Sequence, residues 1–340
     1  MNDQLKIMLF SKKNLFPLGL LVIALFLPLI NDSNYFMSVM VNCLLFGSIG
    51  FAWNILAGYG GQISLCHSGF MAIGAYTCFI LYNNYGVSTL LSMPVGMFIC
   101  YLFATVMGKV TLRYRGPFFT ISTVVFIELL RVMLLYFKEL TKGASGILIS
   151  FKQEEPWNLI FRSGVPYYYI ALVILVLSIT VTWLFINSKT GYYLRTIKGD
   201  QDAASSLGID ISRIKLVSFQ LSAVMTSVVG AIYALFMTYI EPGTICSTDL
   251  SIKICAIVII GGMGSFWGPL VGAFILIPLS EVALKVFPNG GAQLFYGLGL
   301  IIIMLLIPGG IVSVFRDKVF VWVRKCFFGK TAIKQGGNQV

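Results

Sequence analysis

Charged side chains are scarce in this sequence of 340 residues, of which 11% are charged and 58% are hydrophobic. Soluble globular domains carry about 25% charged residues. Continuous apolar runs of about 20 residues recur along the chain, and each is long enough to cross a bilayer as a helix. The runs do not alternate with a period of two residues, which disfavours a membrane barrel. We therefore predict an all-α polytopic membrane protein.

Side chains for metal, redox and hydrolytic chemistry are also lacking. The single histidine, His67, has no carboxylate or thiolate near it in the sequence with which to bind a metal. The seven cysteines show no paired spacing, and most lie in apolar runs, where cysteine acts as a small hydrophobic residue. Ser68 follows His67, but no third group orients the imidazole as in a catalytic triad. We expect no catalytic residue, no metal site and no enzymatic activity.

A nucleotide site is not expected either. The segment FFGKT at 327–331 ends like a phosphate-binding P-loop, but Arg324 stands where that motif requires glycine. The net charge of +11 could indicate nucleic acid, but the basic residues lie in connectors and at both termini. Membrane orientation and contact with anionic lipid explain such a distribution. The sequence thus predicts membrane lipids as partners, no nucleic acid, and no cofactor bound by this chain.

About ten apolar runs divide the chain into three parts. We expect an N-terminal cytoplasmic segment with the first membrane helix over 1–35, a membrane core over 36–314, and a basic cytoplasmic tail over 315–340. No small-x-small site follows the first run, so we interpret it as a membrane helix rather than a signal peptide. One short run precedes Gly-Gly-x-Gly, which predicts a broken or re-entrant helix at 251–262. The runs cover 15–30, 36–57, 63–83, 91–112, 117–137, 166–187, 216–240, 251–262, 267–286 and 294–314.

The distribution of basic residues along the chain provides a test of the predicted number of membrane spans. If the N-terminus lies in the cytoplasm, ten spans place every strongly basic segment on the cytoplasmic side, as the positive-inside bias requires. We therefore predict that both termini of the multi-pass chain are cytoplasmic. The basic segments are 109–115, 189–215 and 316–334, and the connectors predicted on the outer side are 31–34, 83–90, 138–165 and 241–250.

Two glycine-rich segments share a pattern. GYGGQISLCHSG at 58–69 and GGMGSFWGPLVGA at 261–273 both carry Gly-Gly-x-x-Ser before a stretch rich in small residues. The likeness is either chance or an internal repeat, which transporters often contain. Such glycines serve close helix packing or unwound backbone beside a transport pathway. The alternative for His67 is a structural role. The candidate pathway residues here are Gly60, Gly61, Gln62, Ser64, His67, Gly261, Gly262 and Ser265.

Two charges interrupt the apolar run at 117–137. Glu128 lies near its middle, and Arg131 is one helical turn further on, within reach for an i,i+3 ion pair. A single charge at the centre of a bilayer costs at least about 2.5 kcal/mol. Either the pair faces or gates a polar pathway, or it is a self-neutralised pair inside the helix bundle that orients this helix.

The polar connector RTIKGDQDAASSLGIDISRIK spans 195–215. Within it, Ala203, Ala204 and Leu207 are expected on one face of a short helix, and Gly208 stands where a C-cap would end that helix. A short helix with small residues on its face can lie in a groove of another protein. The alternative is an amphipathic connector that rests on the membrane surface.

Several segments resemble known permeases. Asp202-Ala203-Ala204-x-x-x-Gly208 resembles the EAA…G loop of ABC importer permeases, with Asp for Glu and without the downstream Ile-x-Leu-Pro. NILAGYGGQISLCHSGFMAIGAY resembles the Gly-Gln-x-Ser-Leu-Gly-His segment of branched-chain amino-acid permeases, with Cys66 for Gly. RGPFFTISTVVFIELLR and GGMGSFWGPLVGA are similar to two further segments of that family, and LTKGASGI resembles its Thr-Gly-Gly-x-x-Gly turn, with Lys142 for Gly. Together these segments favour the M-type subunit and cover about residues 40–310.

The resemblance implies one half of a permease pair in the bacterial cytoplasmic membrane that imports leucine, isoleucine or valine. The implied partners are a second permease, two cytoplasmic ATPases that hydrolyse ATP, and an extracytoplasmic substrate-binding protein. Importers of urea, short amides or other amino acids, a secondary transporter or channel without an ATPase, and a membrane enzyme or scaffold acting on lipids are the alternatives. The residues implied in ATPase docking are Arg195, Asp202, Ala203, Ala204, Leu207 and Gly208.

Overall fold

The computed structural model describes residues 24–28, 33–149, 155–286, 297, 298, 301 and 309–312. Helices dominate this part of the chain, and six of them are long and apolar enough to cross a membrane. Its two named strands, β1 (Ile147–Leu148) and β2 (Tyr239–Ile240), have two residues each and pair antiparallel. The predicted all-α membrane fold is confirmed.

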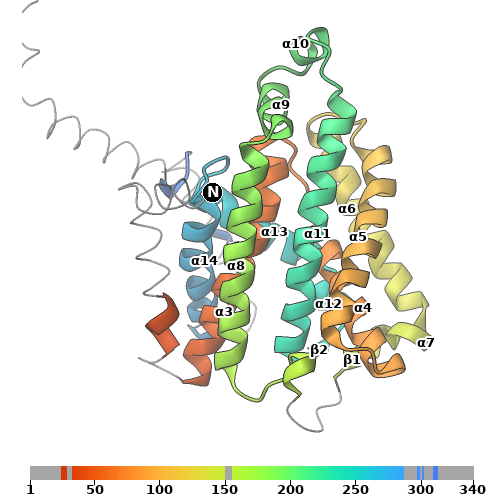
Figure 1. The fold of residues 1–340 in the computed structure, drawn as a ribbon, viewed down its shortest axis with the longest axis vertical. Coiled ribbons are helices and arrows are strands. Elements are labelled where there is room, and N and C mark those ends of the chain that lie inside the picture. Colours follow the sequence, from red (N-terminus) through yellow and green to blue (C-terminus); the bar gives the residue numbers. More distant parts are fainter. Residues whose placement is uncertain are drawn as a thin grey trace, which may run out of the picture.

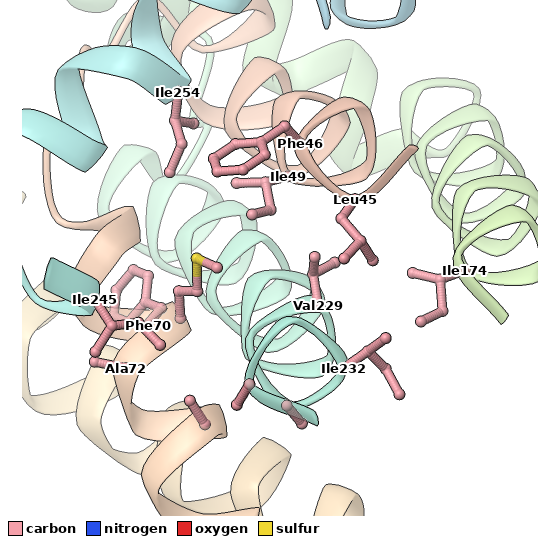
Figure 2. Close-up of a cluster of buried hydrophobic side chains, with 14 of the residues drawn as sticks. Leu45, Phe46, Ile49, Phe70, Ala72, Ile174, Val229, Ile232, Ile245 and Ile254 are labelled. Carbon is pink, nitrogen blue, oxygen red and sulfur yellow. The ribbon is translucent and has the colours of Figure 1, made fainter. Parts of the chain in front are cut away.

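Three helices form the centre of the bundle: α3 (Asn34–Asn54), α4 (His67–Tyr85) and α11 (Ile211–Met237). Glycine lets the α4 and α11 backbones touch, because a Cβ built at Gly74 would overlap Ser227 O and one built at Gly230 would overlap Met71 O. Apolar side chains of all three helices fill the space between them (Figure 2). The labelled ones are Leu45, Phe46, Ile49, Phe70, Ala72, Val229 and Ile232.

The remaining long helices surround this centre, with α5 and α6 at one edge and α14 at the other (Figure 1). Among the described spans, α6 is the least buried, with 22% of its most apolar 18 residues buried, against 94% for the span that contains α3. The surrounding helices are α5 (Thr89–Thr111), α6 (Pro117–Tyr136), α8 (Gly164–Ile186), α13 (Thr248–Gly261) and α14 (Gly268–Val286).

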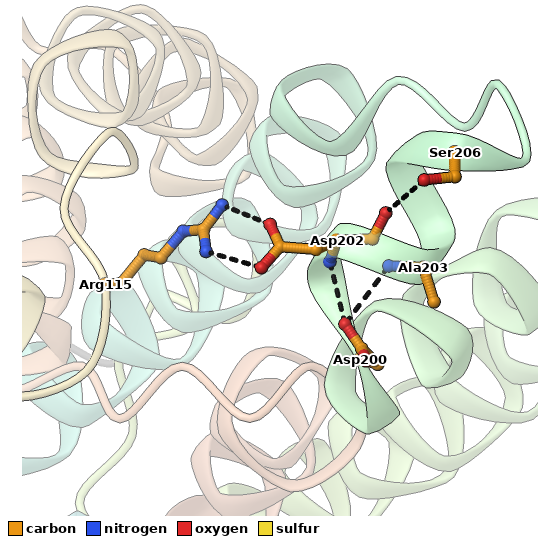
Figure 3. A network of polar contacts seen from close by, with 5 residues as sticks. All are labelled: Arg115, Asp200, Asp202, Ala203 and Ser206. Atoms are coloured by element: carbon orange, nitrogen blue, oxygen red, sulfur yellow. Dashed lines mark hydrogen bonds and ion pairs between the residues drawn. The ribbon is translucent and has the colours of Figure 1, made fainter.

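The connectors gather at two opposite ends of the bundle. At one end, α9 (Lys189–Gly199) and α10 (Gln201–Ser206) project beyond α8 and α11, and Arg115 of the α5–α6 connector reaches Asp202 (Figures 1 and 3). At the other end, β1 pairs with β2 and Tyr82 donates a hydrogen bond to Glu155. The described basic connectors therefore share one end, as the charge pattern predicts. The other end also holds α7 (Lys138–Thr141), η2 (Gly143–Ser145), η3 (Pro156–Asn158) and α12 (Pro242–Ile245).

Eight of the predicted runs correspond to described helices, and the runs at 15–30 and 294–314 lie mostly outside the described residues. The tail at 315–340 lies outside them entirely. The third run begins as a helix at His67 rather than at 63, because the preceding residues form an irregular turn. The run at 251–262 is short, as expected: α13 has 14 residues, about 21 Å, and is separated from α12.

Candidate functional site

The two glycine-rich segments form two turns of similar local structure. The first glycine turn, residues 60–66, follows the π-helical turn η1 (Ile55–Tyr59), and the second glycine turn, residues 262–267, follows α13. The second glycine of each Gly-Gly pair has a positive φ, 68° at Gly61 and 122° at Gly262, which favours glycine. The next helix begins six residues after that glycine in both cases and has 19 residues, α4 in one and α14 in the other. This correspondence supports an internal repeat.

Asn54, the last residue of α3, binds the second glycine turn, and the π-helical turn η1 that follows Asn54 leads into the first. Its Nδ2 donates to Ser265 O at 2.9 Å, and its Oδ1 accepts from the backbone N–H of Gly264 at 2.9 Å. Gly58 of η1 also lies against the second turn, because a Cβ built there would be 2.7 Å from Gly264 N. The structure therefore places the segment that leads into the first glycine turn against the second turn, about 200 positions further along the sequence.

Neighbouring side chains bind the backbone of the first glycine turn. Trp53 Nε1 donates to Ser64 O at 2.7 Å, and Thr120 Oγ1 of α6 donates to Ile63 O at 2.8 Å. The backbone N–H of Leu65 donates to a further α6 threonine hydroxyl at 3.0 Å. The non-helical backbone thus has polar partners within the protein, as such backbone requires at membrane depth.

His67 is fully buried at the start of α4. Ser222 Oγ donates its single proton to Ala52 O at 2.6 Å, so His67 Nε2, 2.7 Å from Ser222 Oγ, must be the donor to that oxygen. His67 therefore connects α4 to α11 and α3. These contacts correspond to the structural role, the alternative to a place in the transport pathway. Gln62 and Ser64 are buried as well, at 4% and 1% exposure.

Glu128 and Arg131 form the predicted ion pair, with 2.7 Å between Glu128 Oε2 and Arg131 Nη2. Their side chains are 43% and 41% exposed. The pair is thus self-neutralised, but it lies on the outer surface of the chain, and its predicted alternative position inside the helix bundle is wrong. Arg131 Nε has no hydrogen-bond partner among the described residues.

The predicted short helix in the polar connector is α10. Asp200 caps its start by accepting hydrogen bonds from the backbone N–H groups of Asp202 and Ala203, at 2.9 and 3.1 Å (Figure 3). Gly208 follows its end with φ 78°, as the sequence predicts.

The prediction that three apolar residues share one face of α10 is wrong. Ala203 and Leu207 are exposed, and Leu207 is 76% exposed, but Ala204 is buried. Successive helical residues are about 100° apart, so Ala204 turns toward its own chain while the two residues four positions apart stay outside. The exposed apolar surface at α10 therefore includes Ala203 and Leu207 but not Ala204.

An exposed ion pair fixes α10 to the α5–α6 connector. Arg115 Nη2 lies 3.0 Å from Asp202 Oδ1, and Nη1 makes a longer contact to the other carboxylate oxygen (Figure 3). The hydrogen bond to Asp202 raises the pKa of Arg115 above its ordinary value. Asp202 thus holds α10 against a second connector at the same end of the bundle.

Helix α9 contacts the first glycine turn directly. Lys198 Nζ donates to Gly58 O at 2.7 Å, and its Cγ would lie 3.1 Å from a Cβ at Gly61. Leu194 packs against Gly60, with 3.0 Å between Leu194 Cδ1 and a Cβ built at that glycine. The helix adjoining the docking candidates is therefore the one that touches the candidate pathway turn.

Leu194, Ile197 and Lys198 were not predicted from the sequence as site residues. Leu194 and Ile197 are buried and three residues apart, a helical spacing that could have identified the inner face of α9. Arg195, a predicted docking residue, instead lies over the ring of Tyr59, 5.4 Å from its centroid. Arg195 therefore joins α9 to its own chain.

Comparison with known proteins agrees with this architecture. A family model described as "Branched-chain amino acid transport system / permease component" matches residues 35–307. The chain is 28% identical to the high-affinity branched-chain amino acid transport system permease protein LivM of Escherichia coli and to that of Salmonella typhimurium, over 91% of this chain and 77% of each relative. It is 22% identical to the corresponding Escherichia coli LivH permease, over 82% of this chain and 96% of that protein. No solved structure matches the chain.

Proposed function

Because the chain belongs to the family of branched-chain amino acid transport system permease components, we propose that it is one of two permease subunits in an ATP-driven importer of leucine, isoleucine and valine. The chain is a multi-pass membrane protein, and its family is a transport family rather than an enzyme family. The family and these relatives favour branched-chain amino acids over urea, short amides or transport without an ATPase.

The proposed partners follow from the relatives and from the two ends of the bundle. Escherichia coli has both LivM and LivH permeases for branched-chain amino acids, which supports a pair of homologous permeases. Two cytoplasmic ATPases bind and hydrolyse ATP, and a binding protein delivers the amino acid from the opposite side. The basic end of the bundle faces the cytoplasm of a bacterial cell, together with both termini.

The contact of α9 with the first glycine turn is the observation that carries this proposal. The ATPases dock on α10 and on the cleft of about 710 Å³ between α9 and the start of α11. Their closure moves α9, and α9 displaces the first glycine turn through Leu194 and Lys198. Asn54 holds the second turn at the end of α3, so the first turn moves relative to it. Nucleotide state thereby biases two conformations of the permease pair.

Translocation requires no bond chemistry from this chain. The amino acid crosses between the two permeases beside the glycine turns, where backbone N–H and C=O groups contact its ammonium and carboxylate groups. Apolar walls accept its branched side chain. Gly60, Gly61, Gly261 and Gly262 are the residues that leave this backbone accessible once the turns separate.

Gly208→Val tests the docking of the ATPases. A valine is strained at φ 78°, so we expect α10 to lose its geometry and ATP-dependent leucine uptake into proteoliposomes of the complete importer to fall about tenfold. Membrane insertion stays intact, because no atom outside its immediate neighbours lies within 4 Å of a Cβ at this position. Gly199→Val is the matched control, since that glycine has equal space and no positive φ. Unchanged uptake by the Gly208 variant would contradict the docking role.

A further inference from the structure

The outward face of α6 combines apolar side chains with a charged pair at mid-membrane depth. Glu128 lies 11 residues after Pro117, about 16 Å along a helix about 30 Å long. A charge at this depth is too far from either end of the helix to reach water easily. The apolar part of the face consists of Phe118, Ile121, Val125, Leu129, Val132 and Tyr136, each 46–78% exposed.

Lipid is a poor environment for this face. The ion pair is 41–43% exposed, so its charges would meet hydrocarbon on the outer side of the chain. Pairing reduces the cost of burying two charges but does not remove it, and further hydrogen bonds are needed to compensate. Within the described residues, the pair's own contact is the only ion pair that either side chain makes, and Arg131 Nε has no hydrogen-bond partner.

Helix α8 provides the contrast. It has 23 residues, none of them charged, and its outward side chains include Val173, Leu177 and Leu184, each 57–59% exposed. Every one of these groups is compatible with lipid. The two helices have comparable length and apolar character, but α6 alone of the two carries charges at its middle.

We infer that the α6 face, with Glu128 and Arg131 at its edge, is the surface on which the second permease subunit packs. This inference rests on the proposed function, because it requires a second permease. The partner covers the ion pair and supplies a polar group to its exposed part. The relatives already include two homologous permeases in one organism, so a partner of the same fold exists for such a pairing. The outward face of α8 then contacts lipid.

Photocrosslinking in the complete importer tests this assignment. Benzoylphenylalanine is placed singly at Val125 and Val132 of α6 and, as matched controls, at Val173 and Leu177 of α8. All four side chains point outward, so the probes leave the fold intact. After irradiation in membranes, we expect a covalent adduct with the second permease from both α6 positions and from neither α8 position. Adducts from α8, or none from α6, would overturn the inference.

Charge variants provide a second measurement. Glu128→Gln or Arg131→Gln leaves one uncompensated charge in the interface, so we expect about tenfold less second permease to copurify with this chain. The double variant removes both charges and restores most of the copurification. Lys142→Gln, at the opposite end from α9 and α10, is the control. Equal copurification by the single variants and the wild type would contradict burial of the pair.

The experiments distinguish failure of the proposed function from failure of the interface assignment alone. If the tagged wild-type chain purifies without a second permease or an ATPase, the proposed function fails, and this inference fails with it. If the complete importer purifies and the adducts come from α8, only the assignment of the interface fails.

Discussion

The two glycine turns have the same local pattern but meet different neighbours. At the first turn, the space left by Gly60 and Gly61 is occupied by Leu194 and Lys198 of α9. At the second turn, a Cβ at Gly261 would overlap Gly268 O, so this glycine lets α13 and α14 meet backbone to backbone. The first turn thus packs against α9, whereas the second lies where two membrane helices of the same chain are in direct backbone contact.

This difference indicates which of the two turns can move and which one stays fixed. A side chain such as Lys198 can shift by several tenths of an ångström, whereas a backbone-to-backbone contact between packed helices cannot yield without moving a helix. The first turn is therefore suited to receive displacement from α9, and the second turn provides the fixed surface against which that displacement acts. Three substitutions test this interpretation.

Gly261→Ala has the largest expected effect. The added methyl group would overlap Gly268 O and lie 3.0 Å from Gly272 N, so α13 and α14 must separate. Overpacking of this kind costs about 3 kcal/mol of the free energy of unfolding. Thermal unfolding of the purified permease in detergent measures the loss. Gly199→Ala, with no neighbour within 4 Å, is the control, and equal melting temperatures for the two variants would refute a clamp at the second turn.

Asn54→Leu has an intermediate expected effect. Leucine keeps the volume of the fully buried side chain but removes both hydrogen bonds, which leaves Gly264 N and Ser265 O without these partners. Each unsatisfied buried group costs about 1–3 kcal/mol. We expect a lower melting temperature and slower leucine uptake, because the second turn is no longer held in place at the end of α3 while the first turn moves.

Asn187→Leu is the control for this substitution. The Asn187 side chain is exposed and donates to Trp183 O of the preceding helix α8. The substitution should therefore change neither the melting temperature nor the rate of leucine uptake measurably. If Asn54→Leu transports leucine at the wild-type rate, transport does not require the second turn to be held by Asn54.

Lys198→Met has the smallest effect on stability and tests coupling alone. Methionine keeps an apolar stem over Gly61 but loses the bond to Gly58 O, and the side chain is exposed, so the stability cost is at most about 0.5 kcal/mol. We expect ATP hydrolysis by the complete importer to continue while leucine uptake per ATP falls several-fold. Lys109→Met, an exposed position in the last turn of α5, should leave this ratio unchanged. A wild-type ratio in the Lys198 variant would rule out transmission through this bond.

Most of the helical architecture could be predicted from the sequence. Helix existence follows from runs of apolar residues, and the alternation of basic connectors predicts which connectors share an end. The limits of α10 were predictable because a capping side chain and a C-terminal glycine act within a few residues, as Asp200 and Gly208 do. The Glu128–Arg131 pair was predictable for the same reason, since its partners are one helical turn apart.

Burial and long-range partners could not be predicted. The sequence pattern did not indicate that Ala204 turns inward, that His67 bonds Ser222, or that Gln62 is buried. Each of these depends on which helix lies opposite, and a single sequence gives no measure of that. The sequence therefore predicted which segments form the candidate site, but it did not predict how these segments are arranged in space.

The sequence by itself determined which stretches form helices, which connectors are basic, and where backbone can leave the helical conformation, because hydropathy, charge and glycine act locally. The tertiary structure decided that Asn54 of α3 binds the second glycine turn, that Lys198 of α9 reaches Gly58 O, and that the Glu128–Arg131 pair faces outward. These contacts depend on the mutual packing of helices distant in the sequence, so only the assembled bundle specifies them.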